Sequence, residues 1–331
     1  MPIFDLGYRH WKGALTASWQ RWWPITRTGT VLAWKARGLR WLLIVSCWPL
    51  LWLGWGFWLI GYMSDHKQRL GDQWNELLKM IGGPLAKAFL DNPDTMRLTL
   101  WSVLFDWQTR FFQISFFVPV LVGFVGATLI SRDIRTKAHL VYFSRPISIW
   151  HYLLGKGAIV ATFIALVTLV PALFLYGLAV AFSPSYSVIS QTWMLLPKLF
   201  LCFLTIAVPS TLLILLLSTW TRSAAFAIIG WLVIWLMGEM MFASLNHVEE
   251  LKTKSWPLIF SFTANLRVVC HQILDVPSLL KSIGSQGWEA GDWTRSVTDP
   301  HRLAPSVWYL VTVSTGCLLG IVYKLSKLLK A

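Results

Sequence analysis

The side chains most able to do chemistry in this sequence are the basic residues of one segment, Ser131–Lys156, which lies between two long apolar runs. Its cations, set against the single acid Asp133, are Arg132, Arg135, Lys137, Arg145 and Lys156. Guanidinium and ammonium groups bind phosphates and carboxylates through charge-assisted hydrogen bonds. The segment therefore predicts a binding surface, on which Arg145 and Lys156 anchor anionic groups of a partner, and not a centre that breaks bonds.

The same segment predicts a short amphipathic helix. Its apolar residues recur at helical spacing: Ile134, Ala138, Val141 and Tyr142. The tripeptide Ser-Arg-Pro at 144–146 then ends the helix, because proline disfavours helical continuation. We expect Tyr142 and Phe143 to be exposed there and to supply apolar contact area to a partner.

Catalytic and metal-binding motifs are absent from the whole sequence. There is no G-x-x-x-x-G-K-[ST], G-x-S-x-G or H-E-x-x-H pattern, so we expect neither nucleotide hydrolysis nor other catalysis by this chain. The 4 cysteines and 7 histidines show no ligand spacing, so we expect no metal and no cofactor. The histidines are expected in loops or at the membrane interface.

Charge is scarce inside the apolar runs. Glu239 is the one acid within such a run, and it is either a candidate outer gate residue or an interfacial residue. Lys198 is expected to extend to lipid headgroups. A proton-coupled pathway is not predicted, because no chain of ionisable groups crosses the runs.

The composition predicts an all-α membrane protein that forms a single transmembrane domain over 1–331. The sequence is 56% hydrophobic and 13% charged, and its 22 tryptophans gather near the ends of apolar runs. Six spans are expected, at 39–63, 111–130, 157–182, 193–218, 223–243 and 305–323.

Two long polar stretches, 64–110 and 244–304, are expected to be extracytoplasmic loops. Asp94 is expected to cap a helix that runs into the second span. Within the second loop, Trp256–Val269 is apolar enough to dip back into the membrane or to pack as a small helix.

Residues 1–38 predict cytoplasmic interfacial helices. Trp11, Leu15, Trp19 and Trp22 recur at near-four spacing and so share one face, while the basic residues point elsewhere. A disordered basic tail is the alternative interpretation.

Charge sets the expected orientation. Placing both termini, the segment 131–156 and the turn at Arg222 on one side puts the whole formal charge of +14 there. The positive-inside rule assigns that side to the cytoplasm. Anionic lipid headgroups then account for the basic composition, so no nucleic-acid partner is predicted.

The segment resembles the cytoplasmic coupling region of the ABC type-2 permease family. The matching positions are Asp133, Arg135, Leu140, Ser144, Arg145, Pro146, Ile147, Tyr152, Leu153, Leu154, Gly155 and Lys156. The resemblance implies a coupling helix between spans two and three that docks on a separate ATPase subunit. It implies docking by 133–147 and anchoring of the segment by Tyr152, Gly155 and Lys156. The aromatic N-terminus is similar to the family's interfacial elbow helix.

The resemblance also implies a function and partners. These are an ATP-driven exporter in the bacterial inner membrane, with two ATPase subunits that hold ATP and Mg, a second permease subunit and membrane lipids. Whether extracytoplasmic accessory proteins also bind is a question that the sequence leaves open. The scarcity of polar groups in the spans favours a lipidic or amphipathic cargo, or mechanical work on an outer partner.

Two other classes compete with the exporter. An integral-membrane enzyme acting on lipid-linked substrates needs a cluster of His, Asp or Glu at a membrane boundary; its candidates are Asp91, Asp94, His271 and Asp275. A membrane anchor or scaffold needs no nucleotide at all.

Overall fold

The computed structural model describes residues 20–65, 93–143, 147–183, 186–221, 223–248, 251, 254–276 and 300–330. Over these ranges the chain is helical and contains no β-strand, which confirms the all-α class. Helices long and apolar enough to cross a membrane are Arg37–Trp58, Leu98–Arg135, Ile149–Ala181, Val188–Trp220, Ala224–Asn246 and Leu303–Leu328. The expected 6 spans are therefore present in the described part of the chain.

Several spans consist of consecutive helical segments. In chain order the main segments are α1 (Trp22–Trp34), α2 (Arg37–Ser46), α3 (Trp48–Asp65), α6 (Pro93–Asp106), η2 (Trp107–Phe117), α7 (Val118–Arg135), α8 (Ala138–Phe143), α9 (Ile149–Val167), α10 (Leu169–Ala181), α11 (Val188–Thr192), α12 (Leu195–Trp220), α13 (Ala224–Asn246), η4 (Trp256–Phe260), α14 (Phe262–Ile273), η5 (Pro300–Arg302) and α17 (Leu303–Lys330). Span one changes segment at Cys47 and span three at Thr168.

Span two is much longer than its apolar core. Helix α6, the π-helical stretch η2 and α7 follow one another directly, so the helix runs from Pro93 to Arg135. Residues 93–110, part of the expected outer loop, are therefore helical, and the expected helix that runs into the second span is confirmed. The expected cap at Asp94 is wrong, because the helix has already begun at Pro93.

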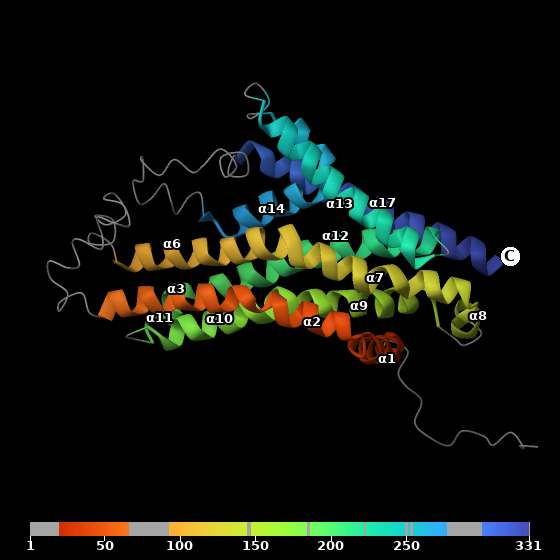
Figure 1. The fold of residues 1–331 in the computed structure, drawn as a ribbon, viewed down its shortest axis with the longest axis horizontal. Coiled ribbons are helices and arrows are strands. Elements are labelled where there is room, and N and C mark those ends of the chain that lie inside the picture. The colour runs from red at the N-terminus through yellow and green to blue at the C-terminus, as the bar shows by residue number, and fades with distance from the viewer. Residues whose placement is uncertain are drawn as a thin grey trace, which may run out of the picture.

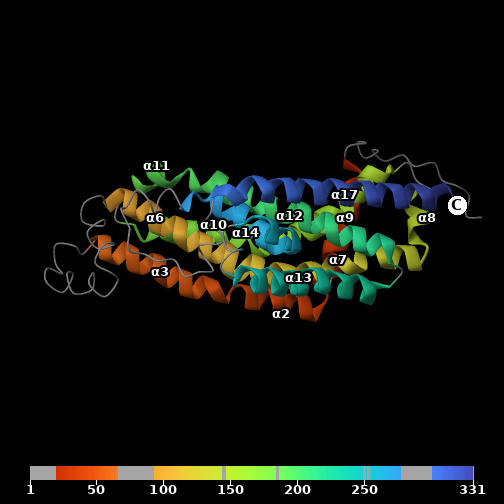
Figure 2. The ribbon, with the colours of Figure 1, turned by 90° about the horizontal axis from the view of Figure 1, so that it is seen from above.

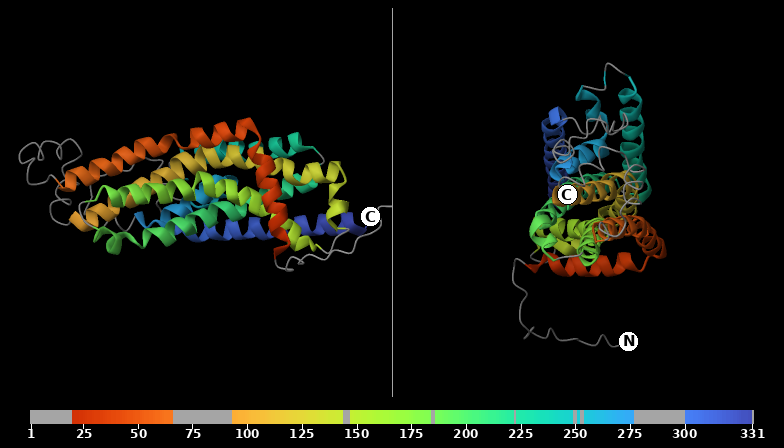
Figure 3. Two further views of the ribbon diagram at one scale, coloured as in Figure 1. Left: turned by 90° about the horizontal axis from the view of Figure 1, so that it is seen from below. Right: turned by 90° about the vertical axis from the view of Figure 1, so that its left-hand side faces the viewer.

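The long helices lie side by side along one axis and define two ends of the molecule (Figures 1 and 2). Helix α8, the junction between α12 and α13, and the end of α17 gather at one end, whereas α6 begins at the other. Helix α1 crosses the bundle close to the α8 end (Figure 3). The segments that carry the expected cytoplasmic charge thus share one end, called here the α8 end.

Helix α14 fills the interior between the spans. Ser261 caps it by accepting a hydrogen bond from the Ala264 N–H at 3.0 Å, and every side chain from Phe262 to His271 is buried. It packs against α12, α13, α17 and η2. Of the two expectations for Trp256–Val269, the structure shows a short 3-10 turn followed by this packed helix.

Candidate functional site

Helix α8 sits in a tight connection between spans two and three. Span two ends at Arg135, and Lys137 adopts a left-handed backbone with φ of 56°, which turns the chain into α8. Span three begins after Ser148, whose hydroxyl accepts a hydrogen bond from the His151 N–H at 3.3 Å. A helix therefore lies between spans two and three, at the position that the sequence predicts.

A buried ion pair ties the two spans together beneath α8. Lys156 Nζ lies 2.8 Å from Asp133 Oδ2, and the same oxygen accepts a hydrogen bond from the Tyr152 hydroxyl at 2.8 Å. Lys156 also donates to the carbonyl of Leu129 at 3.1 Å. The sequence assigned Asp133 to a docking surface and gave Lys156 two roles, binding anionic groups of a partner and anchoring the segment. In the structure the two charges contact each other.

The aromatic residues of α8 complete this arrangement. The rings of Tyr142 and Phe143 each lie 5.5 Å from the Tyr152 ring, centroid to centroid. Lys156 Nζ lies 5.6 Å from the Tyr142 ring centroid. Both rings are half-buried and not fully exposed as expected. Burial and the Asp133 carboxylate raise the pKa of Tyr142, which therefore stays a neutral phenol at physiological pH.

Together, Asp133, Tyr142, Phe143, Tyr152 and Lys156 form what we call the α8 brace. It joins α7, α8 and α9 through a charge pair, hydrogen bonds and ring contacts. The charge pair and the hydrogen bond join spans two and three, and buried polar networks of this kind rigidify a structure. Helix α8 is attached to this joint by the ring contacts of Tyr142 and Phe143.

Helix α1 packs closely against span three at Gly155. The Thr26 hydroxyl donates to the Gly155 carbonyl at 3.1 Å, and both groups are buried. A Cβ at Gly155 would lie 2.8 Å from Ile25 Cβ and 3.0 Å from the Trp22 carbonyl oxygen. Only glycine allows this close approach. The predicted anchoring position Gly155 thus contacts α1, the crossing helix.

Basic side chains surround the α8 brace on its outside. Arg132, Arg135 and Lys137 are exposed, and Ile147 is half-buried. A cavity of about 710 Å³ opens between α1, α7 and α13, and Arg132 and Thr136 are among its polar lining residues. Cations beside a rigid helix are a surface for acidic groups of another chain.

Several predicted positions lie outside the described residues. They are Trp11, Leu15, Trp19, Ser144, Arg145 and Pro146, and for Leu140 only the backbone is described. Of the predicted interfacial face, Trp22 is described and begins α1. The interfacial role of that face stays a prediction.

Toward the opposite end of the molecule, span two carries a second charged cluster. Arg110 forms a bidentate contact with Asp106, its Nε at 2.6 Å from Oδ1, and His271 Nδ1 of α14 lies 3.0 Å from the same Oδ1. All three side chains are buried. His271 was expected in a loop or at the membrane interface, and the structure places it in helix α14. Asp106 and Arg110 precede the expected second span, 111–130, but lie within the longer span that the structure shows.

Glu239 of span five also reaches α14. Its Oε2 lies 2.6 Å from Arg267 Nη2, and its Oε1 accepts hydrogen bonds from Ser261, at 2.6 Å, and from Thr263. Gly238 makes room for this contact, since a Cβ there would lie 2.7 Å from the Phe260 carbonyl oxygen. The sequence left Glu239 between a gate and an interfacial position; its carboxylate binds α14. Lys198, expected at headgroups, lies 3.9 Å from Asp275.

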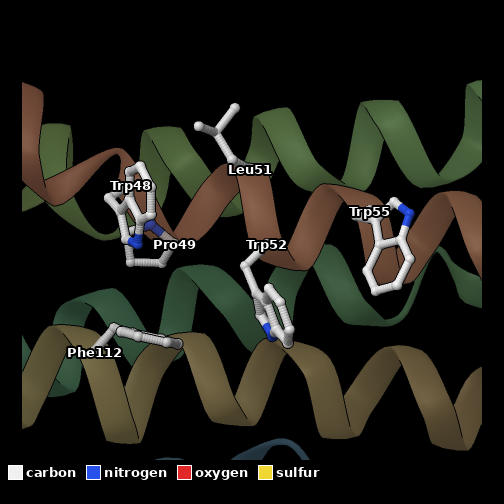
Figure 4. A pocket seen from close by; sticks show the side chains of 6 residues that line it. All are labelled: Trp48, Pro49, Leu51, Trp52, Trp55 and Phe112. Atoms are coloured by element: carbon white, nitrogen blue, oxygen red, sulfur yellow. The ribbon is translucent and has the colours of Figure 1, made fainter.

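The outer face of span one is strongly apolar. A groove of about 650 Å³ lies where α3 meets η2; Figure 4 shows the side chains that line it. Its lining residues are Trp48, Pro49, Leu51, Trp52, Trp55 and Phe112. Indole rings on a lipid-facing surface are common in membrane helices near the interface.

The fold and the 6 apolar helices found among the described residues define a multi-pass helical membrane protein with a braced helical connection between its second and third spans. Comparison with known families matches residues 25–274 to the ABC-2 family transporter protein. The chain belongs to this family and is a permease of an ABC transporter, a class that associates with an ABC ATPase. No curated protein matches the sequence.

Proposed function

We propose that this chain is the non-catalytic permease subunit of an ATP-driven exporter in the bacterial inner membrane, with both termini in the cytoplasm. The α8 brace is the observation that supports this most directly. A helix passes force from a docked partner to the spans only when it is fixed to them, and the α8 brace fixes α8 to both neighbouring spans.

The exposed cations around the α8 brace complete the proposed docking surface. Arg132, Arg135 and Lys137 meet acidic groups of the ATPase subunit, while Tyr142, Phe143 and Ile147 contribute apolar area. Two ATPase copies hold ATP and Mg, and two permease subunits, identical or related, enclose the path. Closure of the ATPases then moves α8 and the spans that the α8 brace joins to it.

A lipidic or amphipathic cargo, or mechanical work on an outer partner, agrees best with the spans. The charges of Asp106, Arg110, Glu239 and Arg267 are engaged with one another inside the bundle. Hydrophilic solutes would need polar groups facing the path. Membrane lipids, and accessory proteins at the outer loops, are the remaining proposed partners.

Affinity purification tests the proposal. The tagged permease is extracted from its own cells in mild detergent, and ATP hydrolysis by the eluate is measured. We expect an ATPase to co-purify, and Arg135→Glu to reduce its recovery at least tenfold, because charge reversal at an interface is repulsive. Lys327→Glu makes the same change on an exposed side chain of α17 and is expected to leave recovery unchanged.

Two results would overturn the proposal. The first is the absence of any nucleotide-hydrolysing protein from the wild-type eluate. The second is full biological function with an ATPase subunit that cannot hydrolyse ATP, which would identify a scaffold.

The enzyme alternative has a buried Asp106–His271 pair, but His271 Nε2 bonds to no nucleophile among the described residues.

A further inference from the structure

Two spans hold α14 through charged contacts to Arg267 and His271, which are four residues apart and so lie on one face of the helix. Asp106 of span two contacts His271 and is itself paired with Arg110. Glu239 of span five, whose side chain is 24% exposed, contacts Arg267. We call these two sets, Asp106–Arg110–His271 and Glu239–Arg267, the α14 clamps.

The α14 clamps are joined through span two. Arg267 Nη1 donates to the Ser115 hydroxyl at 3.0 Å, and Ser115 in turn donates to the Arg110 carbonyl at 2.8 Å. Ser115 and Arg110 belong to η2, whose wider π-helical turns are frequent at functional positions. One polar network therefore connects span two, α14 and span five.

Span four is attached to the same helix by a pair of thiols. Cys202 Sγ lies 3.7 Å from the Cys270 carbonyl oxygen, and Cys270 Sγ lies 4.0 Å from the Cys202 carbonyl oxygen. Both cysteines are buried. Helix α14 thus has a specific polar contact with spans two, four and five.

Moving α14 out of this position would separate Arg267 from Glu239 and His271 from Asp106. Arg267 and His271 are about 1–2% exposed, as is Asp106. An ionised group left without its partner in a low-dielectric interior is strongly unfavourable, and more so at membrane depth. A transport cycle that detached α14 would meet that penalty at every turnover.

We infer that Asp106 and Glu239 are positioning residues that fix α14 between spans two, four and five as one rigid block. Helix α14 therefore moves together with span two and does not swing away as a gate. This inference rests on the proposed exporter function. Span two is a continuous helix from Asp106 to Asp133, a length of about 40 Å, so it links the α14 clamps to the α8 brace.

Hydrogen exchange of the assembled complex tests the inference. Amide exchange of the peptide covering 262–273 is followed by mass spectrometry, with and without ATP. A rigid block predicts exchange rates that agree within about twofold in the two states, because opening of α14 is not part of the cycle. Exchange that becomes at least tenfold faster in one nucleotide state would show a moving gate and overturn the inference.

Variants of the isolated permease test the clamps without nucleotide. Glu239→Gln removes the carboxylate that lies 2.6 Å from Arg267 and is expected to accelerate α14 exchange at least tenfold. The double variant Glu239→Gln/Arg267→Gln removes both charges and is expected to restore slow exchange. Lys198→Gln breaks the exposed, 3.9 Å pair with Asp275 and is the matched control, expected to change nothing.

The two sets of experiments allow failure of this inference to be distinguished from failure of the proposed function. If no ATPase binds the permease, the exporter proposal fails, while the variants still report on the clamps. Exchange in Glu239→Gln as slow as in Lys198→Gln would refute the positioning role. If Glu239→Gln does not fold, slow exchange in the double variant supports the charge pairing, and fast exchange there contradicts it.

Discussion

Removing the Lys156 charge tests the α8 brace most directly. The Lys156 and Asp133 side chains are 9% and 13% exposed, and their charges lie 2.8 Å apart. In Lys156→Met the carboxylate keeps its bond from Tyr152 but loses the ammonium group that lies 2.8 Å away. Breaking a buried pair by removing one partner costs about 3–5 kcal/mol.

The loss is measurable as thermal stability. At roughly 2 °C per kcal/mol, the lower value for large chains, Lys156→Met should lower the Tm of the purified permease by about 6–10 °C. Asp133→Asn keeps an acceptor for Tyr152 and Lys156 but removes the carboxylate charge opposite the buried ammonium, so it should cost about as much as Lys156→Met. The double variant Asp133→Leu/Lys156→Met removes both charges, so it should lose only about 1 kcal/mol for the unpaired Tyr152 hydroxyl.

Arg135→Met is the control for this series, because Arg135 is an exposed cation at the end of span two, the span that carries Asp133. Its Tm should stay close to that of the wild type. The reasoning is refuted if Lys156→Met melts within about 1 °C of Arg135→Met. It is also refuted if the double variant is less stable than Lys156→Met, since the charges would then act independently.

Three further experiments test contacts at the α8 end and the orientation of the molecule. Gly155→Ala should destabilise the permease by about 1–3 kcal/mol, because its Cβ meets Ile25 at 2.8 Å, whereas Gly177→Ala, with nothing within 4 Å, should not; thermal unfolding compares them. Ser218→Ala should cost about 1–3 kcal/mol in the same assay, since the Ser218 hydroxyl accepts from the Ile130 and Ser131 N–H groups at 3.0 and 2.9 Å. Ser190→Ala, at an exposed hydroxyl, should stay within about 0.5 kcal/mol, and equal losses for the two serines would contradict the assignment. For sidedness, a membrane-impermeant thiol reagent applied to intact cells should label Tyr186→Cys but not Arg135→Cys in a cysteine-free background, and the reverse pattern would invert the proposed orientation.

Hydropathy and charge were sufficient to predict the spans and the location of α8. An uncharged apolar helix of about 20 residues is typical of a membrane span. Each span can therefore be predicted from its own stretch of sequence, without knowledge of the rest of the chain. The helix at Ala138–Phe143 follows from local periodicity and from Ser-Arg-Pro at 144–146. The inward direction of Lys156 is not local, since it depends on Asp133, which lies on the preceding span.

The α14 clamps depend on contacts between distant parts of the chain. Asp106 and His271 are 165 positions apart, and nothing near either residue reveals the other. A helix that runs from about Asp94 into the second span was expected, but the pairing of its charges inside the bundle was not. An acid four residues before a base is a favourable helical pair, and that spacing was the signal for the Asp106–Arg110 contact.

The pairing of Glu239 with Arg267 could have been inferred from the sequence more readily than the pairing of Asp106 with His271. A carboxylate within an apolar span requires a cationic partner or water, and Glu239 is the one acid in such a run. Arg267 is the one Lys or Arg in the apolar stretch Trp256–Val269, which follows span five directly enough to fold back on it. Charge neutrality inside the membrane therefore selects Arg267 as the partner of Glu239, and the observed 2.6 Å contact is the pairing that this physical requirement demands.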